Sequence, residues 1–197
     1  MRMESLPILN YLAQTAPGVL TVGGARMAFI DVESGFWCIR RQLETLLGIP
    51  LTNTVFQQAG ANGGASFAAS QGITQDPQEQ KNLFVRCLQA YQAGGFGKFE
   101  IIGADWTLDR VSVRGQDTFE AWMMNRHGRQ VDNPVCVYTA GVMVGFVNAI
   151  SQRRDVVCIE RSCQARGDEC CQFDLLPASQ TVGQAVIAFT HDPALGS

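Results

Sequence analysis

The stretch that decides the fold is rich in cysteine and reads Cys158-Ile159-Glu160-Arg161-Ser162-Cys163-Gln164-Ala165-Arg166-Gly167-Asp168-Glu169-Cys170-Cys171-Gln172-Phe173. β-Branched residues over 156–159 predict one strand, and alternation over 172–176 predicts a second. Gly167 and Asp168 between them are typical of a turn. The stretch therefore predicts an antiparallel hairpin that brings Cys163 and Cys171 to the same end.

Donors suited to a metal ion gather at that end of the predicted hairpin. Glu160 would lie one strand step inside Cys163 and Cys171. Three such donors need a fourth to make a closed tetrahedral zinc site. Cys136 is the favoured fourth donor, because it opens a predicted helix over 136–150 whose first turn can sit over the hairpin end.

The other cysteines are weaker candidates for this site. Cys158 competes with Cys136 for the fourth position, because it is two residues from Glu160 and shares its strand face. The side chain of Cys170 points to the face opposite Cys171. A free cysteine generally packs as a small buried hydrophobe. We expect no metal role for three cysteines, Cys38, Cys87 and Cys170.

The same residues carry a family resemblance. The runs 134–141 and 160–173, with Gly145 between them, closely resemble the vinyl-4-reductase domain. This family includes effector-binding domains of activators that sense aromatic hydrocarbons, proteins of the divinyl step of bacteriochlorophyll synthesis, and two proteins of a cyanobacterial photosystem II assembly operon. The resemblance is specific over 134–176. It implies a structural zinc ion held by four residues, Cys136, Glu160, Cys163 and Cys171.

Composition restricts the class of protein. A chain of 197 residues with a net charge of −3 and a pI near 5.3 predicts one domain and carries no electrostatic signal for nucleic acid. An odd number of cysteines and no secretory leader indicate a reducing cytoplasm. The longest apolar stretch, 134–150, contains glycines, a threonine and an asparagine, so we interpret it as a buried helix and expect no transmembrane segment.

Hydrophobic periodicity predicts the remaining elements. A helix is predicted over 34–47 and ends at the glycine and proline that follow it. It carries an apolar stripe of Phe36, Trp37, Ile39, Leu43, Leu46 and Leu47. A capping box, Asp117 to Glu120, is predicted to open a helix that ends near 128. The other predicted helices cover 5–14, 53–71 and 76–91. The other predicted strands lie within 23–31, 98–105 and 107–113.

Helices grouped ahead of an antiparallel sheet predict an α+β domain with the helices on one face. We expect one domain over 1–197, with an N-terminal helical extension over 1–17, a zinc-binding core over 134–176 and a tail over 191–197. The resemblance implies the ligand-binding fold of the NO-signalling and Golgi-transport type, commonly a homodimer.

In such relatives an apolar pocket between helices and sheet holds a hydrophobic small molecule. Phenol sensors hold phenol with a histidine and a tryptophan, but neither His127 nor His191 matches the first position, and the second falls near Phe119. A simple phenol is therefore not the expected ligand. The candidate ligand-binding residues are Trp37, Phe56, Phe67, Phe99, Trp106, Phe119, Trp122 and Tyr138, with Phe96 and Met123 as further candidates.

Three function classes remain. The first is non-catalytic binding of a hydrophobic molecule, specifically a tetrapyrrole such as a bilin or chlorophyll precursor, in photosynthetic complex assembly. The second is a tetrapyrrole vinyl reductase or its accessory subunit, which the sequence disfavours because it has neither a dinucleotide fingerprint nor iron–sulfur cysteine spacing. The third is a sensor of an aromatic hydrocarbon, or an assembly module, that acts on a separate protein partner.

Overall fold

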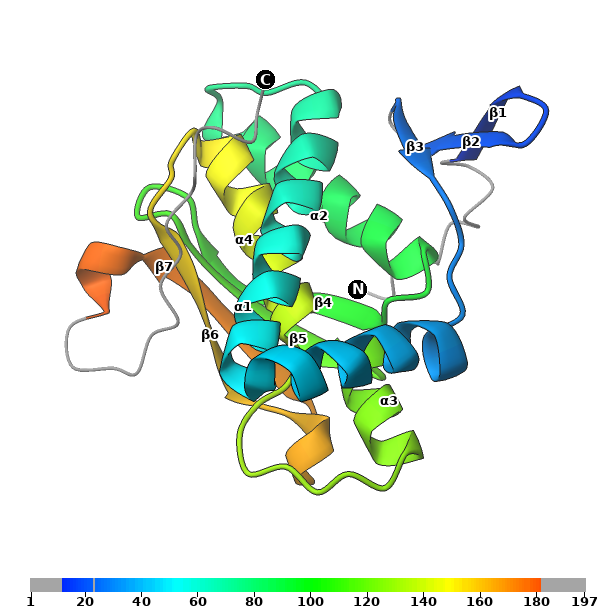
Figure 1. The fold of residues 1–197 in the computed structure, drawn as a ribbon. Coiled ribbons are helices and arrows are strands. Elements are labelled where there is room, and N and C mark those ends of the chain that lie inside the picture. Colours follow the sequence, from blue (N-terminus) through cyan, green and yellow to red (C-terminus); the bar gives the residue numbers. More distant parts are fainter. Residues whose placement is uncertain (1–11, 23, 182–197) are drawn as a thin grey trace.

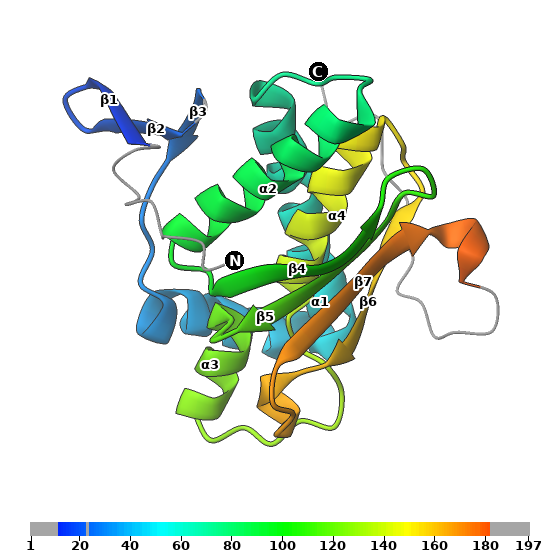
Figure 2. The same ribbon diagram turned by 180° about the vertical axis from the view of Figure 1, so that it is seen from behind.

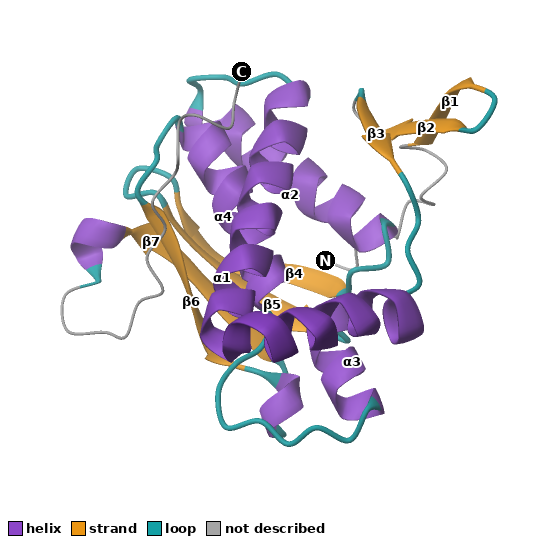
Figure 3. Ribbon diagram, viewed as in Figure 1, coloured by secondary structure: helices purple, strands orange, loops and turns teal. Residues whose placement is uncertain are grey.

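The protein is described by a computed structural model over residues 12–22 and 24–181. A four-stranded antiparallel sheet is covered on one face by helices, as Figures 1 and 2 show from opposite sides. The colouring of Figure 3 separates this helical layer from the sheet. The predicted α+β architecture is therefore confirmed.

The sheet contains β4 (Lys98–Asp105), β5 (Arg110–Gln116), β6 (Val156–Ser162) and β7 (Cys171–Pro177) in the order β4-β5-β7-β6. Each neighbouring pair is antiparallel. The predicted cysteine-rich hairpin is thus formed by β6 and β7. The turn between them includes Gly167 at φ 93°, a left-handed conformation that favours glycine.

Within the described residues, four helices build the covering layer: α1 (Trp37–Ser70), α2 (Pro77–Ala93), α3 (Phe119–Arg126) and α4 (Val137–Ser151). A short helical turn, η2 (Val32–Phe36), leads into α1. Helix α1 consists of two segments joined by a kink at Gly48, whose φ is 77°. The predicted helices over 34–47 and 53–71 are therefore both present, with the break where glycine and proline predicted it.

Helices α1 and α4 pack backbone against backbone. A Cβ atom added at Gly141 would lie 2.1 Å from the carbonyl oxygen of Gln57, and one at Gly145 would lie 2.2 Å from that of Ala61. Only glycine fits such an approach. The small residues of α1 thus contact another helix, and the contact fixes α4 and the Cys136 that precedes it.

The N-terminal region differs from the prediction. Part of the predicted helix over 5–14 lies outside the described residues, and its last residues belong to β1 (Leu12–Ala16). Strands β1, β2 (Val19–Val22) and β3 (Ala25–Met27) form a separate antiparallel sheet beside the main domain (Figure 1). A turn at Gly18, with φ 73°, and the β-branched residues after it favour a hairpin over a helix.

Two other expectations concern the ends and the membrane. The predicted tail over 191–197 lies outside the described residues. Over 12–22 and 24–181, no helix combines the length and apolar character that crossing a membrane requires. The apolar stretch around α4 is instead a core helix, and ten of its residues from Val137 to Val147 are buried together with Ile150.

Candidate metal centre and adjoining cleft

The four residues predicted to bind zinc lie together. One ligand atom from each of Cys136, Glu160, Cys163 and Cys171 lies within 4.8 Å of the other three. The sulfur of Cys136 is 3.9 Å from that of Cys163 and 3.7 Å from that of Cys171. All three cysteines are fully buried. The set could hold a metal ion.

Local structure around the hairpin aims these side chains at one point. Cys136 is the residue immediately before α4, and Cys171 begins β7. The Asp168 carboxylate accepts the backbone N–H of Cys163 at 2.7 Å and a guanidinium N–H of Arg166 at 2.7 Å, which fixes the turn. The Thr118 hydroxyl lies 3.2 Å from the Cys136 sulfur, so the start of α3 also supports the cluster.

Glu160 has one satisfied and one unsatisfied carboxylate oxygen. Oε2 accepts the backbone N–H of Cys136 at 3.0 Å, whereas Oε1 is buried without a hydrogen-bond partner. Burial raises the pKa of Glu160 well above its usual range, and the charge of Cys163 raises it further. An unpaired buried oxygen is costly, and a cation beside it would remove that cost. The donor set and its orphaned oxygen therefore fit a metal ion.

The three clustered thiols differ in acidity. Burial raises the pKa of Cys136 well above its usual range. Hydrogen bonds from Cys136 and Cys163 lower the pKa of Cys171 to about 4, and burial opposes them. Cys171 is therefore the most acidic of the three thiols. Cysteine sulfurs and a carboxylate oxygen are both among the donors that Zn²⁺ accepts.

The remaining cysteines lie outside the cluster. Cys158 is buried on β6 but is not among the four clustered donors, which favours Cys136 over it as the fourth. Cys170 is half-buried, and Cys87 is in the core. Cys38 is exposed. The absence of a metal role for Cys38, Cys87 and Cys170 stays a prediction.

The hydrogen bonds of the predicted capping box at the start of α3 are not formed. Thr118 occupies the cap position of α3, and its side chain makes no capping hydrogen bond there. The buried Glu120 carboxylate instead accepts the backbone N–H groups of Tyr138 at 2.9 Å and Thr139 at 2.8 Å, so it caps α4. Burial raises the pKa of Glu120 to about 7, although these two hydrogen bonds lower it. Sequence spacing could not reveal a cap that comes from another helix.

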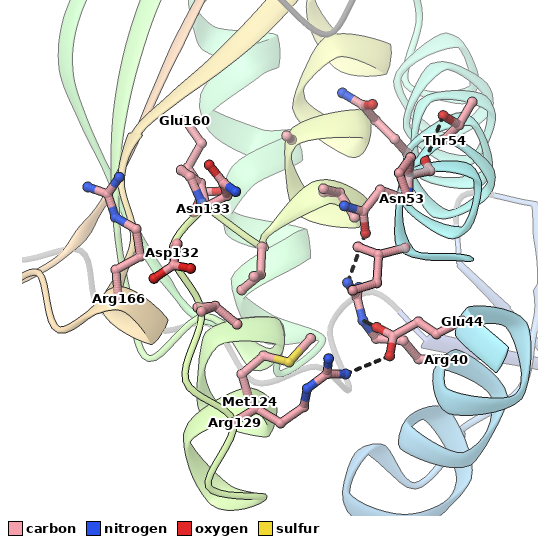
Figure 4. Close-up of a pocket in the computed structure, with 18 of the residues that line it drawn as sticks. Arg40, Glu44, Asn53, Thr54, Met124, Arg129, Asp132, Asn133, Glu160 and Arg166 are labelled. Atoms are coloured by element: carbon pink, nitrogen blue, oxygen red, sulfur yellow. Dashed lines mark hydrogen bonds and ion pairs between the residues drawn. The ribbon is translucent and has the colours of Figure 1, made fainter. Parts of the chain in front are cut away.

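A cleft of about 1130 Å³ adjoins the metal cluster. It lies between α1, the segment 129–135 and β6, and Glu160 is part of its wall (Figure 4). Apolar side chains of its lining include Ile49, Pro50, Val137 and Ala140. Figure 4 places Glu160, Asp132 and Arg166 on one side, and Arg40, Glu44 and Asn53 on the other.

The α1 side of the cleft is charged and buried. Nε of Arg40 donates to Glu44 Oε1 at 3.0 Å, and Nη2 of Arg40 donates to Asn53 at 2.9 Å. Arg129 and Arg41 both donate to Glu44 Oε2, at 2.5 Å and 2.9 Å. Burial raises the pKa of Glu44, but Arg129 and Arg40 outweigh it and lower the pKa below its usual value.

This charged cluster overturns the predicted apolar stripe of residues 34–47. Ile39, Leu46 and Leu47 of that stripe are exposed, whereas Arg40 and Glu44 are buried. Periodicity identified the helix correctly, but only Phe36, Trp37 and Leu43 of the predicted stripe are even partly buried. The i,i+4 spacing of Arg40 and Glu44 was the available sequence signal, and such pairs are usually found on solvated faces.

Comparison with known proteins now identifies the cysteine-rich region. Residues 125–177 match the vinyl-4-reductase domain. This match confirms the family resemblance drawn from the motifs, and it spans α4, the hairpin and all four clustered donors. No curated protein matches the chain.

The fold as a whole also has a solved counterpart. The chain resembles the crystal structure of the phenol-responsive sensory domain of the transcription activator PoxR with phenol. The TM-score is 0.75 at 18% identity, over 88% of each chain. This likeness extends the shared fold beyond the vinyl-4-reductase match to the helices and strands that precede it.

Three of the eight predicted ligand-binding aromatic residues, Phe56, Phe119 and Tyr138, pack together around Phe36. The Phe36 ring lies 5.0 Å from Phe56, 5.2 Å from Phe119 and 6.3 Å from Tyr138, measured between ring centroids. Phe96 lies 5.5 Å from Phe119. The rings therefore form a packed group, in which Phe56 and Phe119 are buried.

The other predicted aromatic residues are dispersed, and none of the eight lines the cleft. Trp37 stacks on His127 at 4.1 Å. Trp122 is exposed, and Met123 is in the core. Three further rings pack against core aromatic residues: Phe67 on Phe146, Trp106 on Phe84, and Phe99 on Tyr91.

Proposed function

We propose that this chain is a non-catalytic module that binds a hydrophobic small molecule and is held together by a structural zinc ion. The cleft of about 1130 Å³ beside the metal cluster carries the proposal. Ligand sites are typically concave, with volumes of about 300 to 1,000 Å³, mostly apolar walls and a few polar groups. The cleft slightly exceeds this range, which suits a bulky ligand.

The proposed zinc ligands are Cys136, Glu160, Cys163 and Cys171. Bound there, zinc would act as a cross-link between α4 and the hairpin, with no open position for catalysis. This is why a vinyl reductase is the weaker alternative. Thiol ligands must stay reduced, so we expect the protein in the cytoplasm.

The specific ligand that we propose is a tetrapyrrole, a bilin or a chlorophyll precursor, in photosynthetic complex assembly. The size of the cleft and the photosynthetic branch of the vinyl-4-reductase resemblance support it. The PoxR domain was crystallised with phenol, and its shared fold supports small-molecule sensing as the broader function. A sensor of a colourless aromatic ligand is therefore the second candidate.

We further propose a homodimer that acts on a separate protein partner. The support is a set of exposed apolar side chains on both sides of the kink in α1, namely Ile39, Leu46, Leu47, Ile49 and Leu51. Exposed apolar groups of this extent on one element are typical of an interface. Sedimentation analysis of Leu46→Glu, which should shift the protein toward monomer, tests this assignment.

The test of the ligand is an absorbance spectrum, with metal analysis, of protein purified from cells that make bilins and chlorophyll precursors. We expect a visible band and one zinc ion per chain. A colourless protein that contains zinc would reject the tetrapyrrole and favour the second candidate.

A matched pair of variants locates the ligand. Thr54 and Thr45 are both exposed on α1, and each hydroxyl donates to the carbonyl four residues earlier. Only Thr54 lines the cleft. Thr54→Trp should abolish the visible band, whereas Thr45→Trp should retain it. Equal spectra for the two variants would exclude the cleft as the site.

A further inference from the structure

One side-chain nitrogen in the cleft wall has no partner. Arg40 is 1% exposed, and its Nε and Nη2 donate to Glu44 and Asn53. Its Nη1 is buried and makes no hydrogen bond. A buried guanidinium N–H without an acceptor is costly, because the group has lost its water and gained nothing in return.

The neighbouring carboxylate cannot supply the missing acceptor. Glu44 uses Oε1 for Arg40, and it shares Oε2 between Arg41 and Arg129. Three guanidinium groups thus surround the Glu44 carboxylate, and Glu120 is a second acidic group that interacts with Arg40. Even with both carboxyl groups ionised, three positive and two negative charges leave an excess of positive charge. An anionic oxygen placed beside Arg40 would satisfy Nη1 and reduce this excess.

The second arginine at this end reaches the cluster from the opposite wall. Arg129 belongs to the segment that faces α1, and Figure 4 shows its guanidinium extending to Glu44. The Trp37 ring supports it, with the guanidinium carbon of Arg129 5.8 Å from the ring centroid. Trp37, predicted as a ligand contact, therefore positions a charged group instead.

The rest of the cleft wall contains both apolar and charged side chains. Ile49, Pro50, Val137 and Ala140 line it, and Asp132 and Glu160 lie on the side away from Arg40. Arg161 and Arg166 also line that side, but their guanidinium groups pair with Asp174 and Asp168, whereas Arg40 Nη1 has no acceptor. The anionic group of a ligand would therefore be directed to the Arg40 end of the cleft.

We propose that this end of the cleft is an anion subsite. It would bind the carboxylate or phosphate of an amphipathic ligand through Arg40 Nη1, supported by Arg129, while the apolar body of the ligand lies along α1 and α4. Guanidinium groups bind both kinds of anion through charge-assisted hydrogen bonds. The inference rests on the proposed function, because it assumes that the cleft binds a small molecule.

Three matched probes test the subsite by isothermal titration calorimetry: decanoate, decyl phosphate and decan-1-ol, each kept monomeric. They share an apolar chain and differ in the head group. We expect the two anions to bind about tenfold or more tightly than the alcohol, the effect of one charge-assisted hydrogen bond. The ratio between decanoate and decyl phosphate identifies the preferred anion.

Single-residue variants then test which arginines cause the preference for the anionic probes. Arg40→Met should remove it while leaving decan-1-ol binding unchanged. Arg129→Met, on the less buried partner, should reduce it, and provides the test if Arg40→Met does not fold. Arg114→Met is the control, because Arg114 is exposed on β5, outside the cleft, and pairs with Glu100. This control should keep the full preference.

The possible outcomes distinguish a failure of the anion subsite from a failure of the proposed cleft function. Equal affinity for all three probes in the unmodified protein, or a preference that survives Arg129→Met and any folded Arg40→Met, would overturn the anion subsite and leave the proposed cleft function intact. If none of the probes binds, the cleft is not a site for amphipathic molecules, and both claims fail.

Discussion

Two glutamates place their carboxylates close to Cys136, and only one of them has all its hydrogen bonds. Glu120 accepts two backbone N–H groups at the start of α4, one on each oxygen. Glu160 accepts one N–H, from Cys136 itself, and its other oxygen has no partner. Burial raises the pKa of both carboxyl groups.

The two carboxylates therefore differ in role: Glu120 stabilises a helix, whereas Glu160 is a proposed metal ligand. Glu120 completes the N-terminus of α4, where a carboxylate satisfies free N–H groups. Glu160 has a free oxygen within a cluster of three cysteine sulfurs, which is the arrangement that a metal ion would complete. Removing either carboxylate should therefore have different consequences for folding and for metal binding.

The largest expected effect is on the metal cluster itself. Cys171→Ser removes one of the four clustered donors, and structural zinc sites contribute on the order of 10 kcal/mol of apparent binding free energy. We expect the variant to lose zinc and to unfold or aggregate, as followed by metal analysis and circular dichroism. Cys170→Ser, one residue away and half-buried, is the control and should resemble the unmodified protein. A Cys171→Ser protein with full zinc content and unchanged Tm would refute the metal site.

The next effect concerns Glu120. Glu120→Ala leaves the backbone N–H groups of Tyr138 and Thr139 buried without acceptors, at a cost of about 2 to 6 kcal/mol in the free energy of unfolding. Urea denaturation should show this loss, while any folded fraction retains zinc. Glu100→Ala, at an exposed position on β4, should change the unfolding free energy little. Loss of zinc without loss of stability would mean that Glu120, too, serves the metal.

A smaller effect depends on pH. The pKa of Glu120 is about 7 in the folded protein, against a usual value of 4.5. The folded state therefore binds more protons between these values, and stability due to this group is lost as pH rises through about 7. Glu120→Gln removes that dependence, so its unfolding free energy relative to the unmodified protein should rise by about 3 kcal/mol between pH 4.5 and pH 7.5. A constant difference across this range would contradict a raised pKa at Glu120.

The smallest effect is expected for Glu160→Gln. The amide preserves the shape and the hydrogen bond from Cys136 but removes a charged ligand, so zinc affinity should fall by roughly tenfold or more, judging from the 10- to 100-fold effect of outer-shell changes. Competition with a chelator measures the change. Glu120→Gln serves as the matched comparison and should leave zinc affinity nearly unchanged. Equal losses in the two variants would remove the distinction between the carboxylates.

Much of the metal cluster could be predicted from the sequence because its geometry is local. Cys163 and Cys171 flank one hairpin turn, and strand pairing alone brings them together. Glu160 precedes Cys163 by three residues, and Cys136 begins the helix that leads back into β6. Short connections of this kind leave few alternatives.

The aromatic residues were harder to place. Phe36, Phe56, Phe119 and Tyr138 come from four separate elements, and the structure packs their rings together as one group. An aromatic side chain has the same sequence signature whether it fills a core or lines a pocket. The family resemblance therefore predicted a hydrophobic site, but the sequence could not distinguish the wall of that site from the core.

What the sequence determined by itself was the set of helices and strands of the main domain, the break at Gly48, and the donors that the β6–β7 hairpin brings together. Only the tertiary structure decided that Glu120 caps a different helix, and that α1 buries Arg40 and Glu44 while exposing Leu46. Helical periodicity fixes which residues share a face, whereas the partners of the helix decide which face is buried. Here the partner is Arg129, which pairs with Glu44 from the segment that faces α1, while Asn53, beyond the kink of α1, accepts a hydrogen bond from Arg40.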